Sequence, residues 1–167
     1  AQIFQKRIQI RFREADPARI MYFGNLLNLA HDCFEDFIQT TGLTWQDWFS
    51  KSPYLVPIRH TECDYRAPFV PGQFYTIEAC VAQIRDTSFQ MKYTFKQDDK
   101  VHATAKMVHA FLDPQTKQKI AVPAHLRALL TPYLEGSDDI KEARQKRVVA
   151  EGVRFDAKEA ANAARRT

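Results

Sequence analysis

A long stretch of helical periodicity between two extended segments is the feature that most limits how this chain can fold. Its apolar positions are Leu26, Leu29, Ala30, Cys33, Phe34, Phe37 and Ile38. This spacing predicts one amphipathic helix from Asn25 to Thr40, with Gly42 as its C-terminal cap. A helix with so broad an apolar stripe is buried most economically by a curved antiparallel sheet that wraps around it.

The segments on both sides of this helix alternate with the two-residue period of strands. Before it, residues 6–13 place Ile8, Ile10 and Phe12 on one side and polar side chains on the other. After it, four more strands are expected at residues 57–67, 73–85, 88–97 and 101–113. Their order suggests an antiparallel meander. The fold class is therefore α+β, with five strands and one long helix.

Shorter helices and a charged C-terminal segment complete the predicted organisation. One short helix is expected from near Thr44 and another within residues 122–134. Residues 136–167 contain eight Lys or Arg, six Asp or Glu and a single aromatic residue. We therefore expect a domain at 1–135 and a charged, helical appendage at 136–167, which is either a solvated or packing segment or a binding element for a partner or ligand.

Composition restricts the class of protein. A chain of 167 residues with 45% hydrophobic content can form one packed domain without disulfides or metals. The cysteines, Cys33, Cys63 and Cys80, are odd in number and widely spaced, so we expect reduced packing residues in a cytoplasmic protein. No membrane span or signal peptide is expected. A formal charge of +4 would favour an anionic small molecule, but it is too weak and dispersed to indicate nucleic acid, so no nucleic-acid partner is expected.

A carboxylate, Asp16, precedes the long helix in the stretch "READPARIMYFGN". An aspartate followed by proline is typical of an ordinary turn or helix cap. A loop carboxylate beside a helix N-terminus also provides a base or nucleophile, next to unpaired N–H groups that stabilise a developing oxyanion. Local sequence alone leaves both roles open.

Four segments, in order, resemble the hotdog-fold acyl-CoA thioesterases of the 4-hydroxybenzoyl-CoA thioesterase family. They are "RFREADPARIMYFGN", the helix after it, "PIRHTECDYRAPFVPG" and "DTSFQMKYTF". The resemblance extends from Phe4 to Leu134 and implies a five-stranded antiparallel sheet wrapped around one long central helix. It also implies hydrolysis of a CoA thioester without a cofactor. A homodimer or homotetramer is expected, because a long apolar edge strand is a liability in a monomer.

The same resemblance assigns roles to residues near the start of the helix. Asp16 corresponds to the family's catalytic aspartate, acting as nucleophile or general base, and the backbone N–H of Phe23 to the donor that polarises the thioester carbonyl. Tyr22 and Asn25 also match the family pattern and are expected to bind substrate. Ser88 matches the family's serine and is expected to position substrate, since without an Asp–His pair it is a poor nucleophile.

Two positions depart from the family pattern. Arg19 stands where the family usually has glycine, and a cation there would narrow the site, shift the loop or contact a CoA phosphate. His31 replaces the Asp or Glu of many relatives and resembles the subgroup that acts on 1,4-dihydroxy-2-naphthoyl-CoA. An aryl-CoA, this one or 4-hydroxybenzoyl-CoA, is therefore the favoured substrate.

Arg85, just before the turn that contains Ser88, is either a contact for a CoA phosphate or an ordinary surface arginine.

Other assignments remain open at this point. Glu35 is the reserve catalyst, because other hotdog branches place their carboxylate on the long helix, although acids on a polar helix face, such as Glu35 and Asp36, are usually a solvated surface. His60 and Cys63 lack the four ligands of a structural zinc site, so no metal is expected. The alternative class is a non-catalytic module that binds acyl-CoA or acyl carrier protein. A dehydratase would be expected to carry a histidine in the loop, where this chain has none.

Overall fold

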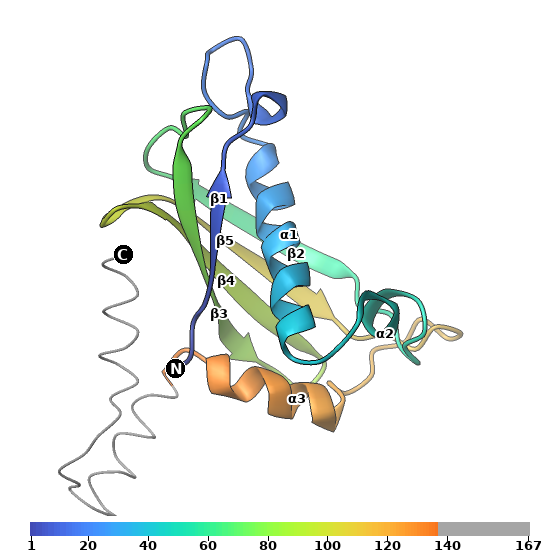
Figure 1. The fold of residues 1–167 in the computed structure, drawn as a ribbon. Helices are drawn as coiled ribbons and strands as arrows, with labels where there is room; N and C mark the ends of the chain where they lie inside the picture. Colours follow the sequence, from blue (N-terminus) through green and yellow to red (C-terminus); the bar gives the residue numbers. More distant parts are fainter. Residues whose placement is uncertain (137–167) are drawn as a thin grey trace, which may run out of the picture.

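The computed structural model describes residues 1–136, so the predicted appendage lies outside the described residues except for Gly136. The elements are β1 (Phe4–Gln9), a 3-10 turn (Phe12–Glu14), α1 (Asn25–Thr40), α2 (Trp45–Phe49), β2 (Ile58–Tyr65), β3 (Phe74–Ile84), β4 (Ser88–Gln97), β5 (Lys100–Ala110), α3 (Ala124–Leu130) and a second 3-10 turn (Thr131–Tyr133) (Figure 1). Within the described part of the chain, no helix is both long and apolar enough to cross a membrane.

The five strands form one antiparallel sheet in the order β1-β3-β4-β5-β2. The meander prediction holds for β3, β4 and β5. It is wrong for β2, which pairs with β5 at the far edge of the sheet and not with β3, the next strand along the chain. Local alternation identifies a strand, but it does not determine which edge of the sheet that strand joins.

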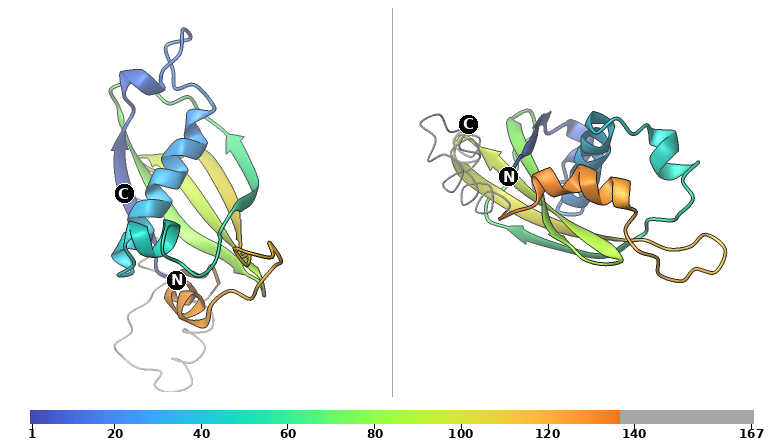
Figure 2. Two further views of the ribbon diagram at one scale, coloured as in Figure 1. Left: turned by 90° about the vertical axis from the view of Figure 1, so that its right-hand side faces the viewer. Right: turned by 90° about the horizontal axis from the view of Figure 1, so that it is seen from below.

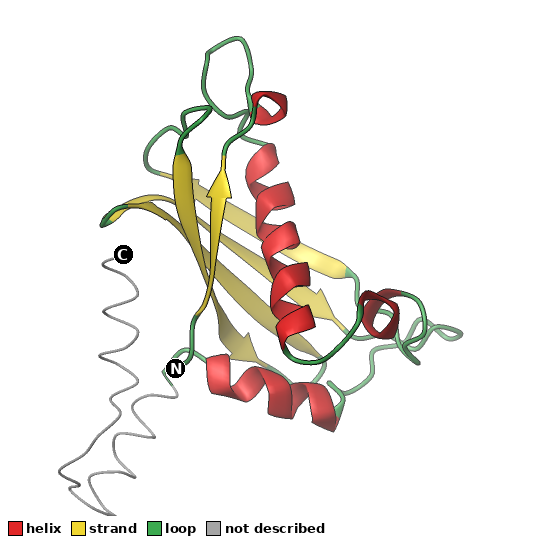
Figure 3. Cartoon of the chain, viewed as in Figure 1, coloured by secondary structure: helices red, strands yellow, loops and turns green. Residues whose placement is uncertain are grey.

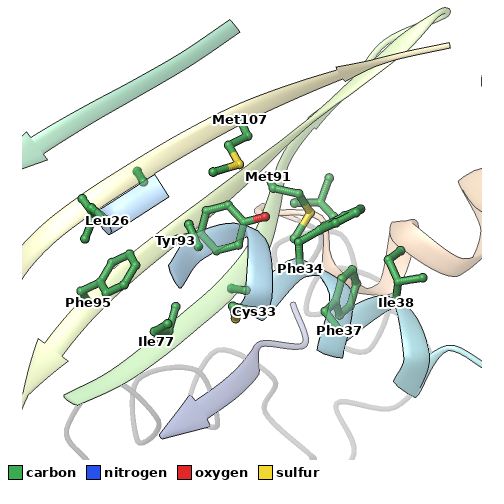
Figure 4. Packing of buried hydrophobic residues seen from close by; sticks show 14 of the residues in the cluster. Leu26, Cys33, Phe34, Phe37, Ile38, Ile77, Met91, Tyr93, Phe95 and Met107 are labelled. Atoms are coloured by element: carbon green, nitrogen blue, oxygen red, sulfur yellow. The ribbon is translucent and has the colours of Figure 1, made fainter. Parts of the chain in front are cut away.

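The long helix α1 has the predicted bounds and lies across the concave side of the curved sheet (Figure 2). Its buried residues are Leu26, Ala30, Cys33, Phe34, Phe37 and Ile38. Figure 4 shows several of them packed against Ile77, Met91, Tyr93, Phe95 and Met107 from the sheet. Full burial of each large apolar side chain contributes about 1.5–3 kcal/mol. This contact holds α1 in place and thereby fixes where its N-terminus lies.

The predicted ends of the helices are also observed. Gly42 has a φ of +93°, a left-handed conformation that a glycine adopts without steric cost, just after α1 ends. Thr44 caps α2, because its hydroxyl accepts a hydrogen bond from the Asp47 N–H at 3.1 Å. α3 closes one end of the sheet.

Two expectations about individual side chains are wrong. Phe12 was expected on the buried side of the first strand, but the strand ends at Gln9 and the following 3-10 turn leaves Phe12 93% exposed. Cys63 was expected to be a packing residue, but every residue of β2 is exposed. Among residues 1–136, little covers the inward side of this edge strand, because it extends beyond the helix.

A histidine is buried between the helix and the sheet. The His109 ring packs against the rings of Phe34 and Phe89, with centroid distances of 4.3 Å and 4.7 Å. Burial, and to a smaller extent the neighbouring His31, lowers the pKa of His109 to about 3. The ring is therefore neutral in the folded protein over the whole pH range in which an exposed histidine titrates.

This burial predicts that acid destabilises the fold. Below about pH 6.5 the unfolded chain binds a proton at His109 that the folded chain does not, so the free energy of unfolding should decrease by up to about 1.4 kcal/mol per pH unit from this group as pH falls toward 3. Urea unfolding of the parent protein and of His109→Phe at pH 4.5 and 6.5 isolates this contribution. Equal pH slopes for the two proteins would contradict it.

Candidate active site

A short hairpin connects the end of the first strand to α1. Ala15 and Met21 form an antiparallel bridge, and the Tyr22 N–H donates to the Glu14 carbonyl at 2.8 Å. At the tip, the Arg19 N–H donates to the Asp16 carbonyl at 2.9 Å and closes a tight turn. The loop that contains this hairpin projects beyond the N-terminal end of α1 (Figure 3). Asp16 thus lies at the end of the helix where the unpaired N–H groups are.

The Asp16 side chain has the local turn role expected of an aspartate before a proline. Its Oδ1 accepts a hydrogen bond from the Ala18 N–H at 2.8 Å. Its second oxygen, Oδ2, has no hydrogen-bond partner among residues 1–136, and the residue is only half-buried. One carboxylate oxygen therefore maintains the turn while the other is open to solvent or substrate.

Arg19 adopts a backbone conformation that glycine adopts more readily than any other residue. Its φ is +65°, in the left-handed region that side chains with a Cβ disfavour by about 1–2 kcal/mol. The loop keeps the turn geometry in spite of the bulkier residue. The guanidinium is exposed, and no hydrogen bond or ion pair involves it within the described residues.

Asn25 attaches the hairpin to the helix. Its Nδ2 donates to the Glu14 carbonyl at 2.9 Å. The Glu14 carboxylate is buried, where it accepts hydrogen bonds from Arg13 Nε at 3.0 Å and the Arg11 N–H at 3.3 Å. Asn25, which the sequence resemblance predicts to bind substrate, has a structural role in its hydrogen bond to the Glu14 carbonyl. Sequence reasoning missed Glu14, since nothing local indicates a buried carboxylate two residues before Asp16.

The backbone at the start of α1 presents two unpaired donors. The Tyr22 carbonyl accepts the Asn25 N–H at 3.0 Å, and the Phe23 carbonyl accepts the Leu26 N–H at 3.3 Å, so both carbonyls point into the helix. Because the peptide unit is planar and trans, the N–H groups of Phe23 and Gly24 point the opposite way, out of the helix. Neither has a hydrogen-bond partner among residues 1–136.

Tyr22 and Gly24 fit closely together beside these donors. A Cβ added to Gly24 would lie 2.7 Å from Cε2 of Tyr22, so a larger residue would require the Tyr22 ring, which is 47% exposed, to move. The Phe23 ring is 65% exposed and stands 4.8 Å from the Tyr22 ring, centroid to centroid. This close approach of Tyr22 to Gly24 was not identified from the sequence.

His31 and Glu35 form a separate pair further along α1. His31 Nδ1 lies 3.3 Å from Glu35 Oε1, and the His31 ring is 6.2 Å from that of Phe49. Glu35 is ten residues beyond Asn25, about 15 Å along the helix axis at about 1.5 Å per residue. The reserve catalyst is therefore distant from the unpaired N–H groups, whereas His31 lies between the two.

Arg85 and Ser88 lie together, but at the other end of the sheet. They line a cavity of about 180 Å³ with Arg59, His60, Gln83, Phe89, Gln90 and Val108. β3 runs from Phe74, which pairs with Gln9 near the hairpin, to Ile84 beside Arg85. At about 3.3 Å per residue, this separates Arg85 from the hairpin by roughly 30 Å. Arg59 was not identified from the sequence.

No group of three or more potential metal ligands occurs among the described residues. His60 and Cys63, three residues apart on β2, point to opposite faces of the strand and so do not form a pair.

Comparison with known proteins agrees with these observations. Residues 10–130 match the thioesterase-like superfamily. A 1,4-dihydroxy-2-naphthoyl-CoA hydrolase from Synechococcus elongatus is 30% identical over 125 residues, which is 74% of this chain and 92% of that protein.

Solved structures show the same fold. A thioesterase structure from Prochlorococcus marinus has a TM-score of 0.73 and 26% identity, with coverage of 77% of this chain and 94% of that one. A 1,4-dihydroxy-2-naphthoyl-CoA thioesterase from Synechocystis has a TM-score of 0.72 and 21% identity, and the match covers 77% of this chain and 96% of that one.

The fold is therefore the hotdog fold, and the chain belongs to the thioesterase-like superfamily. It is a thioester hydrolase, as the sequence resemblance implied.

The left-handed conformation of Arg19 predicts a gain in stability on substitution with glycine. Arg19→Gly should raise the free energy of unfolding by up to about 1 kcal/mol, since relief of the steric cost exceeds the extra entropy of the unfolded chain. Arg19→Ala removes the same charge but keeps a Cβ, so it should show no such gain in urea unfolding. Equal stability of the two variants would rule out backbone strain at this position.

Proposed function

We propose that this protein hydrolyses an acyl-CoA thioester at the N-terminal end of α1, with Asp16 as nucleophile or general base. The observation that supports this most directly is the arrangement of one short loop. It presents a carboxylate oxygen without a hydrogen bond, Asp16 Oδ2, and leads into the unpaired N–H groups of Phe23 and Gly24. Acyl transfer needs these two parts, an attacking or basic group and donors for the oxyanion.

The thioester carbonyl oxygen would accept hydrogen bonds from the helix N-terminus, where the helix dipole also favours negative charge. Asp16 Oδ2 then either attacks the carbonyl carbon, giving an anhydride that water hydrolyses, or removes a proton from the water that attacks. In both routes the C–S bond breaks and CoA leaves as a thiolate. The proton released from the attacking water, which Asp16 holds in the second route, passes to this thiolate or to solvent, so Asp16 is ionised again. The reaction needs no cofactor, because CoA is part of the substrate.

An aryl-CoA is the favoured substrate, with 1,4-dihydroxy-2-naphthoyl-CoA the first choice and 4-hydroxybenzoyl-CoA the second. The name of the Synechococcus relative supports this choice. The exposed rings of Tyr22 and Phe23 beside the N–H groups, and the His31 ring further along α1, offer aromatic surface to such an acyl group. The rate of free-thiol release from a panel of aryl-CoA and straight-chain acyl-CoA esters tests this choice of substrate.

Replacement of Asp16 by asparagine tests the catalytic assignment. Asparagine keeps the oxygen that accepts the Ala18 N–H and so preserves the turn, but it removes the charge. The melting temperature should stay close to that of the parent, while kcat should fall by roughly 100-fold or more with little change in KM.

Glu35→Gln, about three helical turns away, is the matched control and should leave kcat within a few-fold. A fully active Asp16→Asn protein would reduce Asp16 to a turn residue and would favour a non-catalytic binding module. An inactive Glu35→Gln protein would move the catalytic role onto the helix.

The charged cavity at Arg85 bears on how CoA is held. It lies too far from Asp16 to bind the phosphates of the same substrate molecule easily within one protomer. A second copy removes this difficulty: all eight residues of β2 are exposed at the sheet edge, so two copies can pair there antiparallel. The Arg59 end of the partner's β2 then lies beside Tyr65 and Phe23. We therefore expect a homodimer, or a tetramer built from it, with CoA phosphates contacted by the partner's Arg59 and Arg85.

Mixed dimers distinguish this arrangement from a site within one chain. Arg85→Gln alone should raise KM roughly tenfold, and inhibition of the parent by free CoA should weaken as salt rises. In a dimer of one Asp16→Asn and one Arg85→Gln protomer, one site keeps both native residues. The mixed dimer should therefore show the parent KM and about half the parent kcat. A raised KM in the mixed dimer, or a monomer by light scattering, would contradict the shared site.

A further inference from the structure

Tyr65, the last residue of β2, is connected to the start of α1. Its hydroxyl donates a hydrogen bond to the backbone carbonyl of Phe23, 42 residues earlier in the chain. Tyr65 pairs with Ala103, which is buried on the helix side of the sheet, so its ring also lies on that side. The edge strand and the helix N-terminus are thus joined at the point where the proposed reaction takes place.

This hydrogen bond acts on a particular peptide unit. The Phe23 carbonyl belongs to the same planar group as the Gly24 N–H, and within that group the two point in opposite directions. A donor that fixes the carbonyl therefore also fixes the direction of the Gly24 N–H. A hydrogen bond accepted at the carbonyl also polarises the peptide and strengthens its N–H as a donor.

Few other contacts hold this peptide. The Phe23 side chain is 65% exposed, so burial does not anchor it. Among residues 1–136, Tyr65 is the only residue whose side chain forms a hydrogen bond with the Phe23–Gly24 peptide; the other bond to the Phe23 carbonyl comes from the Leu26 N–H at 3.3 Å. The bond from Tyr65 is therefore well placed to control its orientation.

We propose that Tyr65 is a positioning residue for thioester hydrolysis, which holds the Phe23–Gly24 peptide so that the Gly24 N–H acts with the Phe23 N–H as a second donor to the thioester oxygen. This rests on the proposed function. Partial burial raises the pKa of the Tyr65 hydroxyl to about 12, with a smaller contribution from Cys63. The hydroxyl therefore stays protonated, and stays a donor, throughout the working pH range.

Tyr65→Phe removes only the hydroxyl and tests this role. We expect kcat for 4-hydroxybenzoyl-CoA to fall roughly tenfold, less than for outright loss of an oxyanion donor, with KM within about twofold. Tyr75→Phe is the matched control, because the buried Tyr75 hydroxyl also bonds to backbone, accepting the Val70 N–H at 2.8 Å. Tyr75→Phe should lower the melting temperature but leave kcat within about twofold of the parent value.

A spectroscopic measurement distinguishes loss of the Gly24 N–H orientation from a general loss of stability. Hydrogen bonds to a thioester oxygen lower its carbonyl stretching frequency, so 4-hydroxybenzoyl-CoA bound to Asp16→Asn should show a higher frequency once Tyr65→Phe is added. An unchanged frequency, or an unchanged kcat for Tyr65→Phe in a parent that turns over, would overturn this inference alone. A parent protein that hydrolyses no acyl-CoA thioester would overturn the proposed function and this inference with it.

Discussion

Burial of the apolar stripe of α1 by the curved sheet is the constraint on which the rest of the structure depends. Because the helix must lie across the concave face, its N-terminus comes to the end of the sheet where β1 stops. The chain then has to reverse direction between Gln9 and Asn25. The hairpin from Glu14 to Tyr22 makes that reversal, and so it places Asp16 beyond the end of the helix. The position of the candidate site follows from packing of the core.

The turn role of Asp16 and the catalytic role proposed for it are compatible, because they use different oxygens. Oδ1 completes the turn through Ala18, and this contact restrains the carboxylate and aims Oδ2. A restrained carboxylate loses less conformational entropy when it meets its substrate, which is the general advantage of a preorganised group. The hydrogen bond that forms the turn in "DPAR" thus also restrains the carboxylate proposed to act in hydrolysis. Arg19 keeps that geometry at the cost of an unfavourable φ.

Local patterns in the sequence predicted local structure well. The bounds of α1 and β4 agree with the observed ones, because the period of apolar residues and the cap signals act over only a few residues. The edge position of β2 was missed, because strand pairing is decided by contacts between residues distant in sequence. For the same reason Tyr65 was missed: its partner, Phe23, lies on another element. Asp16 and Phe23 were assigned to the site through the resemblance to a family pattern, since turn chemistry alone left the role of Asp16 open, and both assignments stay predictions.

Tyr65 also connects the candidate site to the edge of the sheet. Among the described residues, β2 bonds to β5 on one side only, so no partner strand restrains its other edge. A second copy paired along β2 would satisfy the remaining backbone groups and restrain the strand. Through the Tyr65 hydroxyl, that restraint would reach the Phe23 carbonyl and the N–H groups of the helix. The association of two copies and the direction of the proposed oxyanion donors would then depend on each other. This gives a physical reason for the exposed edge strand to carry Tyr65, the proposed positioning residue.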